Sequence, residues 1–483
     1  MDTNHTSQKP HAILVAYPLQ GHVIPTVHLA IKLASLGFTI TFVNTRAIHH
    51  QTTKAQPSID PDIFSRSHES GLDIRYTTVS DGLPLGFDRS LNHDQFMAAL
   101  LHVFSAHVED LVGQLVGSGE AVHCLIADTF FVWPSKIARK FGLLYVSFWT
   151  EAALVFTLYY HIDLLKLNGH FGSQDCRDDP IDYIPGVKAI KTTDMTSYLQ
   201  ETCTSSVCHE IIFNCFEDVK KADFVLCNTV EELEPEIISA LQAKMAYYAI
   251  GPTFPKYFAK SSVATSLWSE SDCTQWLETK ARASVLYVSF GSYAHLPKRD
   301  LLDFADGLSL SKVNFVWVLR PDIVSSNEAD PLPAGFKEEV ADRALIVPWC
   351  RQKAMLAHPA VGGFLTHCGW NSILESIWCE VPLLCFPLLT DQFTNRKLVV
   401  DDWKIGINVS HKKVITKEDI SQNIDGVMRG KLGDEFRKNI KELKKTLENA
   451  MTPVGSSESN MTRFINDLKA KLEKRVRSQQ ICT

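Results

Sequence analysis

The sequence predicts an α/β protein built from two Rossmann-like, doubly wound halves that face each other across a cleft. Short apolar runs alternate along the chain with segments of helical periodicity, which is typical of parallel sheets covered by helices. The chain has 483 residues, whereas a single hydrophobic core usually divides beyond roughly 250 to 300 residues. Because doubly wound sheets bind ligands beyond the carboxyl ends of their strands, the cleft is the expected site.

The N-terminal half opens with a βαβ unit. Residues 12–17 and 38–43 are apolar runs, and residues 23–36 between them carry apolar side chains at helical spacing. The right-handed crossover rule then makes the two strands parallel. Thr229 and Glu232 form a capping-box pattern ahead of a further helix. Later strands are expected at 122–127, 143–148 and 224–227, and later helices at 131–141, 152–167 and 233–241.

The periodicity lapses near the middle of the chain into Gly251, Pro252, Pro255 and a stretch rich in Ser and Lys, which predicts a linker. Two other segments, 52–94 and 168–204, are turn-rich and poorly periodic, as binding-site loops often are. Strands of the second half are expected at 285–290, 314–319, 344–347, 363–366 and 383–386. The predicted divisions are an N-terminal domain 1–250, a linker 251–270, a C-terminal domain 271–455 and a terminal helix and tail 456–483.

Composition and motifs exclude several classes of function. The net charge is −7 and no long Lys/Arg run occurs, so a nucleic-acid partner is not expected. Glu151 interrupts the most apolar stretch, and the N-terminus lacks a secretory apolar segment, so we expect a cytoplasmic protein without a membrane span. The twelve cysteines contain no Cys-x-x-Cys pair, which favours reduced thiols. Fingerprints of dinucleotide-binding, P-loop, esterase-elbow and zincin proteins are missing.

The most informative window runs from Trp349 to Gln392 and reads WCRQKAMLAHPAVGGFLTHCGWNSILESIWCEVPLLCFPLLTDQ. Its centre is an expected strand followed by a helix start, where free N–H groups and the helix dipole suit a phosphate. Each feature also has a purely structural interpretation. Ser372 with Glu375 could be a capping box, Asp391 could cap the next helix, and Trp370 could belong to the core.

As a whole, this window resembles the plant secondary product glycosyltransferase box, the signature of the plant UDP-dependent glycosyltransferases of family 1, which have the GT-B fold. The resemblance covers nearly the whole window and extends weakly over the rest of the chain. It implies a hexosyltransferase that needs no metal and no cofactor besides its co-substrate, a UDP-sugar. The expected partners are that UDP-sugar and a small acceptor molecule, and the expected state is a monomer.

The resemblance also implies roles in binding the nucleotide. Trp349 would stack on uracil, Cys350 would supply backbone contacts and Gln352 a polar contact. Glu375 would hold both ribose hydroxyls, which an ionised carboxylate accepts strongly. The ligands of the diphosphate would be Ser292, His367, Asn371 and Ser372.

The sugar would be recognised by Trp370, Asp391 and Gln392, and in this family a final glutamine suggests glucose. Thr150 resembles a residue that touches the sugar or phosphate, but it could equally cap the helix that follows. Glu380 departs from the family pattern, because glycine is usual there. If that position needs a positive φ, the glutamate costs roughly 1 to 2 kcal/mol and could weaken donor binding.

The catalytic pair is expected in the N-terminal half. His22 follows the first strand, and Asp128 ends another strand of the same predicted sheet. Imidazole has a pKa suited to taking a hydroxyl proton near neutral pH, and a carboxylate can orient and stabilise it. Both residues match the catalytic histidine and aspartate of the family. The resemblance therefore implies an inverting transfer in which His22 is the base.

The donor sugar and the acceptor are the open points. UDP-glucose is the expected donor and a β-glucoside the expected product, formed on a hydroxyl or carboxyl of a small, largely apolar acceptor. The alternatives are another UDP-sugar (galactose, xylose or glucuronate) and a catalytically weak binder of UDP-sugar or aglycone. Possible walls of the acceptor pocket are Phe130, Phe131, Trp149 and the segments 84–87 and 183–208.

Overall fold

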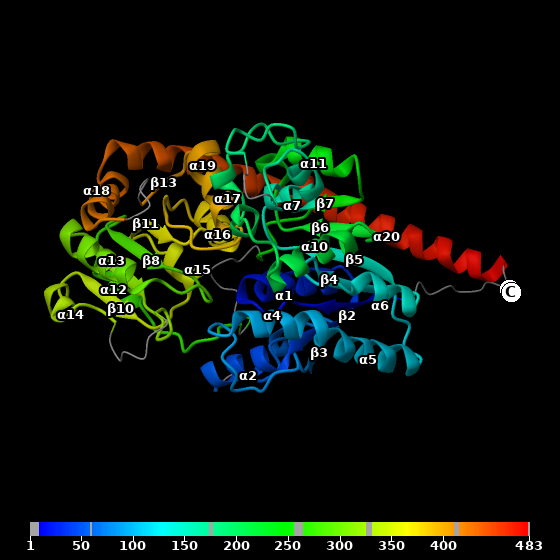
Figure 1. Ribbon diagram of the computed structural model, residues 1–483. Coiled ribbons are helices and arrows are strands. Elements are labelled where there is room, and N and C mark those ends of the chain that lie inside the picture. The colour runs from blue at the N-terminus through cyan, green and yellow to red at the C-terminus, as the bar shows by residue number, and fades with distance from the viewer. Residues whose placement is uncertain are drawn as a thin grey trace.

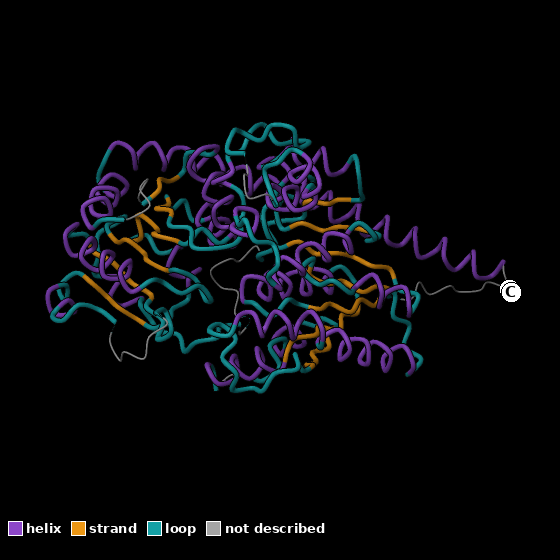
Figure 2. Tube along the Cα trace, in the orientation of Figure 1, coloured by secondary structure: helices purple, strands orange, loops and turns teal. Residues whose placement is uncertain are grey.

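The computed structural model describes residues 9–57, 60–172, 177–255, 263, 265–324, 331–409 and 415–481. Their strands form two separate parallel sheets, each lying between layers of helices (Figures 1 and 2). The first sheet has seven strands in the order β3-β2-β1-β4-β5-β6-β7, and the second has six in the order β10-β9-β8-β11-β12-β13. Most strands are continuous apolar runs, because helices bury both faces of each sheet.

The first sheet is formed by β1 (His11–Val15), β2 (Thr39–Thr45), β3 (Ile74–Val79), β4 (Cys124–Asp128), β5 (Leu144–Trp149), β6 (Phe224–Cys227) and β7 (Tyr247–Ala249). Its helices are α1 (Gln20–Ser35), α2 (Arg46–Ala55), α3 (Ser65–Glu69), α4 (His93–His102), α5 (Phe104–Gly117), α6 (Pro134–Lys140), α7 (Ala153–Tyr160), α8 (Ile162–Leu167), α9 (Ser197–Gln200), α10 (Val207–Val219) and α11 (Pro235–Gln242). The strand order reverses between β1 and β4, and such a switch point opens a crevice at the carboxyl ends of the strands.

The second sheet is formed by β8 (Val285–Ser289), β9 (Asn314–Val318), β10 (Ala344–Val347), β11 (Val361–Thr366), β12 (Leu383–Cys385) and β13 (Gly406–Asn408). Its helices are α12 (Thr274–Glu278), α13 (Lys298–Ser311), α14 (Phe336–Glu339), α15 (Gln352–Leu356), α16 (Trp370–Trp378), α17 (Gln392–Lys397), α18 (Lys417–Met428) and α19 (Lys431–Ala450). Here the order reverses between β8 and β11, so this sheet has a corresponding crevice.

The last helix, α20 (Ser456–Ile481), returns to the first sheet and packs beside β7 (Figure 1). The ring of Phe464 lies 5.6 Å from that of Phe224 and 5.8 Å from that of Tyr248, measured between centroids. The Tyr248 hydroxyl donates a hydrogen bond to Asp467, at 2.6 Å. The end of the chain therefore ties the second half to the first. Eight of the twenty residues of the predicted linker, 256–262 and 264, lie outside the described residues.

Several local predictions are wrong. The single helix expected over 152–167 is two helices that meet at His161. Thr229 and Glu232 form no capping box; the Thr229 hydroxyl instead donates to Glu234, at 2.6 Å, and the helix begins at Pro235. The segment 52–94 contains β3, an edge strand whose middle is only partly buried and therefore lacks a clear apolar pattern. The short strands β7 and β13 were missed for want of length.

One stretch of the described chain, His93–Gly117, is long and apolar enough to cross a membrane by length and composition alone. This is not the stretch around Glu151 that the sequence singled out. It comprises α4 and α5, which meet at Val103, and its apolar residues Phe96, Leu100 and Phe104 pack in a core against the first sheet. Such a helix is weak evidence for a membrane protein, since core helices pass the same test.

Candidate active site

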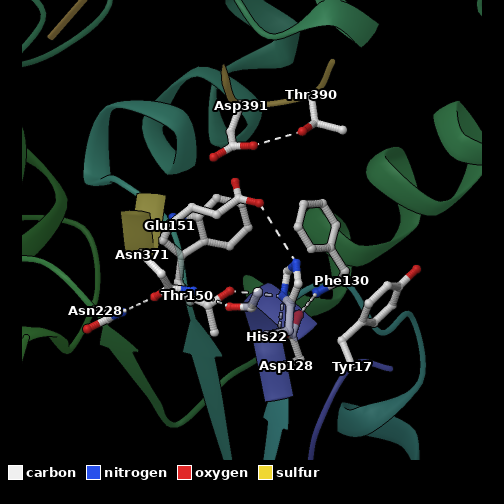
Figure 3. Close-up of polar contacts among 12 residues, drawn as sticks. Tyr17, His22, Asp128, Phe130, Thr150, Glu151, Asn228, Asn371, Thr390 and Asp391 are labelled. Carbon is white, nitrogen blue, oxygen red and sulfur yellow. Dashed lines mark hydrogen bonds and ion pairs between the residues drawn. The ribbon is translucent and has the colours of Figure 1, made fainter. Parts of the chain in front are cut away.

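A cavity of about 790 Å³ lies between the two halves, where the crevices of both sheets meet. It is lined by residues from the ends of β1, β5, β8 and β11 and from the loops that follow them. Every predicted site residue except Asp128 lines this one cavity. Asp128 lies directly behind the cavity wall, in contact with His22 (Figure 3). Residues up to 370 positions apart in the sequence are thus brought to one place by the fold.

The catalytic pair predicted from the sequence is formed. His22 stands in the first turn of α1, and Asp128 is the last residue of β4, which neighbours β1. His22 Nδ1 lies 2.8 Å from Asp128 Oδ2, and both side chains are buried. The other oxygen, Oδ1, accepts from the backbone N–H of Phe130 at 3.0 Å. This arrangement places the proton on Nδ1 and leaves the lone pair of Nε2 facing the cavity, as a general base requires.

Thr150 belongs to the same cluster. It follows β5, and its hydroxyl oxygen lies 2.9 Å from His22 Nδ1. The alternative that Thr150 caps the next helix is wrong, because the N-cap of α7 is Ala152, without a side-chain hydrogen bond. The threonine therefore helps to hold the imidazole ring in place.

The neighbouring Glu151 was missed as a site residue, although its position within an apolar run was a signal. Its Oε1 lies 4.0 Å from His22 Nε2, and its carboxyl points into the site between His22 and Asp391 (Figure 3). Burial raises the pKa of Glu151 well above its usual range, and the nearby carboxylates of Asp391 and Asp128 act in the same direction. The site therefore holds a carboxyl group that resists ionisation beside the basic nitrogen.

Aromatic rings form the wall around His22. The ring centroids of Tyr17 and Phe130 lie 5.4 Å and 5.7 Å from that of His22. Phe131 and Trp149 were expected to join this wall but do not; Phe131 stacks on Phe104 in the core, and the Trp149 indole donates to the Ala152 carbonyl. Phe130 and Phe131 lie in the turn that follows β4, and of the two only Phe130 lines the cavity. The segment 84–87 also lies outside the lining.

On the opposite side of the cavity, His367 follows β11 and is enclosed by two glycines. A Cβ atom at Gly291 or Gly369 would lie 2.6 Å or 2.7 Å from the His367 ring, so the close approach requires glycine at both positions. Gly291 also has a φ of 76°, which favours glycine. Burial lowers the pKa of His367 to about 4, with a further contribution from the Arg320 cation. The imidazole is therefore neutral near pH 7 and has a single N–H to donate.

Arg320 is a second residue that the sequence did not reveal. It is buried, and its guanidinium donates to the carbonyl groups of Gly291 and, at 2.6 Å, Ala294, and to Asp322 at 2.9 Å. These bonds hold the loop that carries Ser292, one of the cavity-lining residues. A planar guanidinium can satisfy several carbonyls at once, which suits it to fixing a loop.

The N-terminus of α16 opens into the cavity. Its N-cap is Gly369, without a side-chain hydrogen bond, so the capping box expected as an alternative for Ser372 and Glu375 is wrong. Both side chains instead bond to Gln352, whose Nε2 donates to Ser372 Oγ at 3.0 Å and to Glu375 Oε2 at 2.8 Å. Burial raises the pKa of Glu375, while Lys353 and the bond from Gln352 oppose that rise. Gln352 therefore positions a buried carboxyl group at the helix start.

Two residues of α16 also join the halves. Asn371 Nδ2 donates to the Gly21 carbonyl at 2.6 Å, and Asn371 Oδ1 accepts from Asn228 at 3.3 Å (Figure 3). The Trp370 indole donates to the Asn228 carbonyl at 2.7 Å and packs against Trp403, so the core interpretation of Trp370 is largely right. The first turn of α1, which carries His22, is thus bonded directly to the helix at the opposite wall.

Asp391 and Gln392 lie at the start of α17. Asp391 accepts from the Thr390 hydroxyl at 2.7 Å and from Asn395 at 2.5 Å, and it makes no side-chain cap, so the capping alternative is wrong. Gln392 Oε1 accepts from the backbone N–H groups of Leu388 and Leu389, at 2.8 Å and 3.1 Å. Burial raises the pKa of Asp391. Both side chains are therefore fixed before any ligand binds.

Three further predicted positions are accounted for. Trp349 is partly exposed in the cavity wall, and Cys350 beside it is buried, with its Sγ 3.8 Å from the Tyr287 hydroxyl. Glu380 adopts a φ of 58°, as the usual glycine at that position implied. Its carboxylate pairs with Lys444 of α19 at 2.8 Å, which offsets part of the strain.

Comparisons with known proteins agree with this geometry. A family model described as UDP-glucoronosyl and UDP-glucosyl transferase matches residues 90–454. The chain is 62% identical over 473 residues to UDP-glycosyltransferase 86A2 of Arabidopsis thaliana, covering 97% of this chain and 96% of that protein. It is 33% identical over 494 residues to 7-deoxyloganetin glucosyltransferase of Catharanthus roseus, covering 98% and 99%.

Two solved structures share the whole architecture. Os79 from O. sativa in complex with UDP matches with a TM-score of 0.82 at 26% identity, covering 95% of this chain and all of that one (100%). Phytolacca americana UGT2 complexed with UDP-2fluoro-glucose and pterostilbene matches with a TM-score of 0.76 at 26% identity, covering 96% and 99%. With two facing Rossmann-like halves and the family match over most of its length, the chain belongs to the UDP-dependent glycosyltransferases of plants and is a UDP-glycosyltransferase of the GT-B fold.

Proposed function

We propose that this enzyme transfers glucose from UDP-glucose, with inversion, to a hydroxyl or carboxyl of a small, largely apolar acceptor and so forms a β-glucoside. The domain of residues 1–250 would bind the acceptor and the domain of residues 271–455 the UDP-sugar, joined by the linker 251–270 and braced by the tail 456–483. The observation that carries the proposal is the His22–Asp128 pair, because His22 lines the cavity and its Nε2 makes no hydrogen bond to any described residue.

In the proposed reaction, His22 Nε2 takes the proton of the acceptor hydroxyl while its oxygen attacks the anomeric carbon of glucose. The bond from that carbon to the UDP oxygen breaks on the opposite face, which inverts an α-linked donor to a β-glucoside. The bonding electron pair leaves with UDP. Asp128, 2.8 Å from Nδ1, stabilises the imidazolium that forms.

The donor side of the cavity carries groups that would stabilise the negative charge on the departing UDP. The N-terminus of α16 carries a partial positive charge, and His367 and Ser292 add hydrogen-bond donors, so Ser372 and Asn371 complete a site for the diphosphate. Trp349 would stack on uracil, beside backbone contacts from Cys350. Glu375, held by Gln352, would accept the two ribose hydroxyls.

Glucose is proposed as the donor sugar on two grounds. Gln392 ends the signature window, and Asp391 and Gln392 are held by hydrogen bonds beside the cavity, where they can discriminate between sugar hydroxyls. The Catharanthus roseus relative is named a glucosyltransferase. We also propose that the reaction needs no metal and that the enzyme is a cytoplasmic monomer. Full activity in excess EDTA would support the first point. Light scattering tests the monomer mass, and a fluorescent fusion tests the cytosolic location.

The function is tested by incubating the purified enzyme with an acceptor panel and UDP-glucose, UDP-galactose, UDP-xylose or UDP-glucuronate, with mass detection of products. We expect a hexose adduct with UDP-glucose and a drop of roughly 10³-fold or more in kcat for His22→Ala, because the base is lost. If the enzyme uses another UDP-sugar in preference to UDP-glucose, that sugar is the donor and the glucose proposal is wrong. Thermal stabilisation by UDP-glucose without any turnover would overturn catalysis and leave a binder.

A further inference from the structure

Glu151 is a buried carboxyl group in the active site that the proposed mechanism does not use. Glu151 is only 8% exposed, and its Oε2 has no hydrogen-bond partner among the described residues. Leaving a buried polar group without a hydrogen-bond partner costs roughly 1 to 3 kcal/mol of folding free energy. Such a group is therefore expected where a bound ligand supplies the missing hydrogen bond. The carboxyl lines the cavity rather than the core, which makes a bound molecule the natural partner.

Glu151 lies close to His22, the proposed base. It follows Thr150 at the carboxyl end of β5, and its Oε1 lies 4.0 Å from His22 Nε2 (Figure 3). This separation is too long for a hydrogen bond, yet short enough for one small ligand to contact both atoms. Adjacent hydroxyl oxygens on one carbon frame are closer together than 4.0 Å, so one can face Nε2 while its neighbour meets Glu151.

We propose that Glu151 is an acceptor-specificity residue, which hydrogen-bonds a second hydroxyl next to the one that His22 deprotonates and thereby favours vicinal diols and catechols over monohydroxy and carboxylate acceptors. The inference rests on the proposed function, because it concerns the acceptor of that reaction. It narrows the broad class of hydroxyl or carboxyl acceptors to those with two adjacent hydroxyl groups.

The chemistry of the surrounding groups supports this selection. Asp128 and Asp391 lie close enough to Glu151 to raise its pKa, and a protonated carboxyl can both donate to and accept from a hydroxyl. An acceptor carboxylate offers only lone pairs and would bring a further negative charge close to the carboxylates of Asp128 and Asp391. A lone hydroxyl leaves the Glu151 carboxyl unsatisfied, and a site built for two polar groups discriminates strongly against a ligand that lacks one.

The test uses three acceptors on one apolar frame: a naphthalenediol with adjacent hydroxyl groups, the matching naphthol and the matching naphthoate. The kcat/KM of each is measured with saturating UDP-glucose for the wild type, Glu151→Ala and Glu151→Gln. We expect the wild type to prefer the diol, and Glu151→Ala to lower the diol-to-naphthol ratio roughly tenfold or more. Glu151→Gln should raise the naphthoate-to-naphthol ratio, because an amide donates to a carboxylate and, unlike a carboxyl group, cannot ionise and repel it.

The control is Glu217→Gln, which removes a carboxylate of α10 that pairs with Lys220 and does not line the cavity. Its two ratios should match those of the wild type. If both ratios stay unchanged in the Glu151 variants, or if only the KM for UDP-glucose rises, the inference is overturned while glucosyl transfer to the naphthol still stands. If the wild type glucosylates none of a broad acceptor panel, the proposed function fails as well. If Glu151→Ala does not fold, the ratios measured for Glu151→Gln, which keeps the side-chain volume, test the inference.

Discussion

The two walls of the cavity hold their ionisable groups in different ways. On the wall of the first half, where we propose that the acceptor binds (the acceptor wall), His22 and Asp128 are bonded to each other, and Glu151 has an oxygen without a partner among the described residues. On the wall of the second half, where we propose that the donor binds (the donor wall), Glu375 is bonded to Gln352, and the Arg320 cation is satisfied by carbonyls of the loop it supports. The first wall keeps a proton acceptor available, whereas the second holds its ionisable groups in place with hydrogen bonds.

This difference follows from the chemistry of each wall. A proton must move on the acceptor side, so an imidazole with a nearby carboxylate is needed there. On the donor side the ligand arrives already charged, and donors that neither titrate nor rearrange stabilise a departing diphosphate best. The lowered pKa of His367, caused by burial and by Arg320, shows that even a histidine is kept neutral on this wall.

The largest effect is expected from a substitution in the His22–Asp128 pair on the acceptor wall. Asp128→Asn removes the counter-charge of the imidazolium and permits the wrong tautomer of His22, so kcat should fall by roughly 10³- to 10⁴-fold. Steady-state kinetics with UDP-glucose and an accepted phenol measure this. Calorimetry should find the Kd for UDP unchanged, because Asp128 lies on the other wall. A loss of kcat below tenfold would contradict the role of the pair.

An intermediate effect is expected on the donor wall. Glu375→Gln replaces an ionisable acceptor of two hydroxyls by a weaker, neutral one, so the KM for UDP-glucose should rise roughly tenfold with little change in kcat. Gln352→Ala is the companion variant; it releases the Glu375 carboxyl and should raise the KM less. A fall in kcat at constant KM would instead place Glu375 in the chemical step.

The smallest effect concerns stability and pH. The pKa of His367 is about 4 in the folded protein, below the ordinary 6.5, so the unfolded chain binds more protons between these values. The wild type should therefore lose stability as the pH falls from about 6.5 toward 4, by at most about 1.4 kcal/mol per pH unit from this residue. Denaturant unfolding at several pH values should show a shallower acid loss for His367→Asn. Parallel curves would contradict a neutral, buried His367.

Much of the fold follows from local pattern. The central strands β1, β4, β5 and β8 are continuous apolar runs bounded by polar or turn residues, so the sequence locates them to within a few positions. The short strands β7 and β13 and the half-buried edge strand β3 carry too little periodicity to be recognised. Capping patterns were the least informative, because four-residue motifs occur often by chance and tertiary contacts decide their use.

For the site, the sequence by itself determined which residues end the central strands, and so placed His22 and Asp128 at one edge of a parallel sheet. It also carried the signature window that the family match bears out. Only the tertiary structure decided that Asn371 bonds to Gly21, that Arg320 holds the loop of Ser292, and that Glu151 stands 4.0 Å from the base. The physical reason is that these contacts join segments distant in the chain or on opposite walls, and their geometry depends on how two sheets dock, which no local spacing encodes.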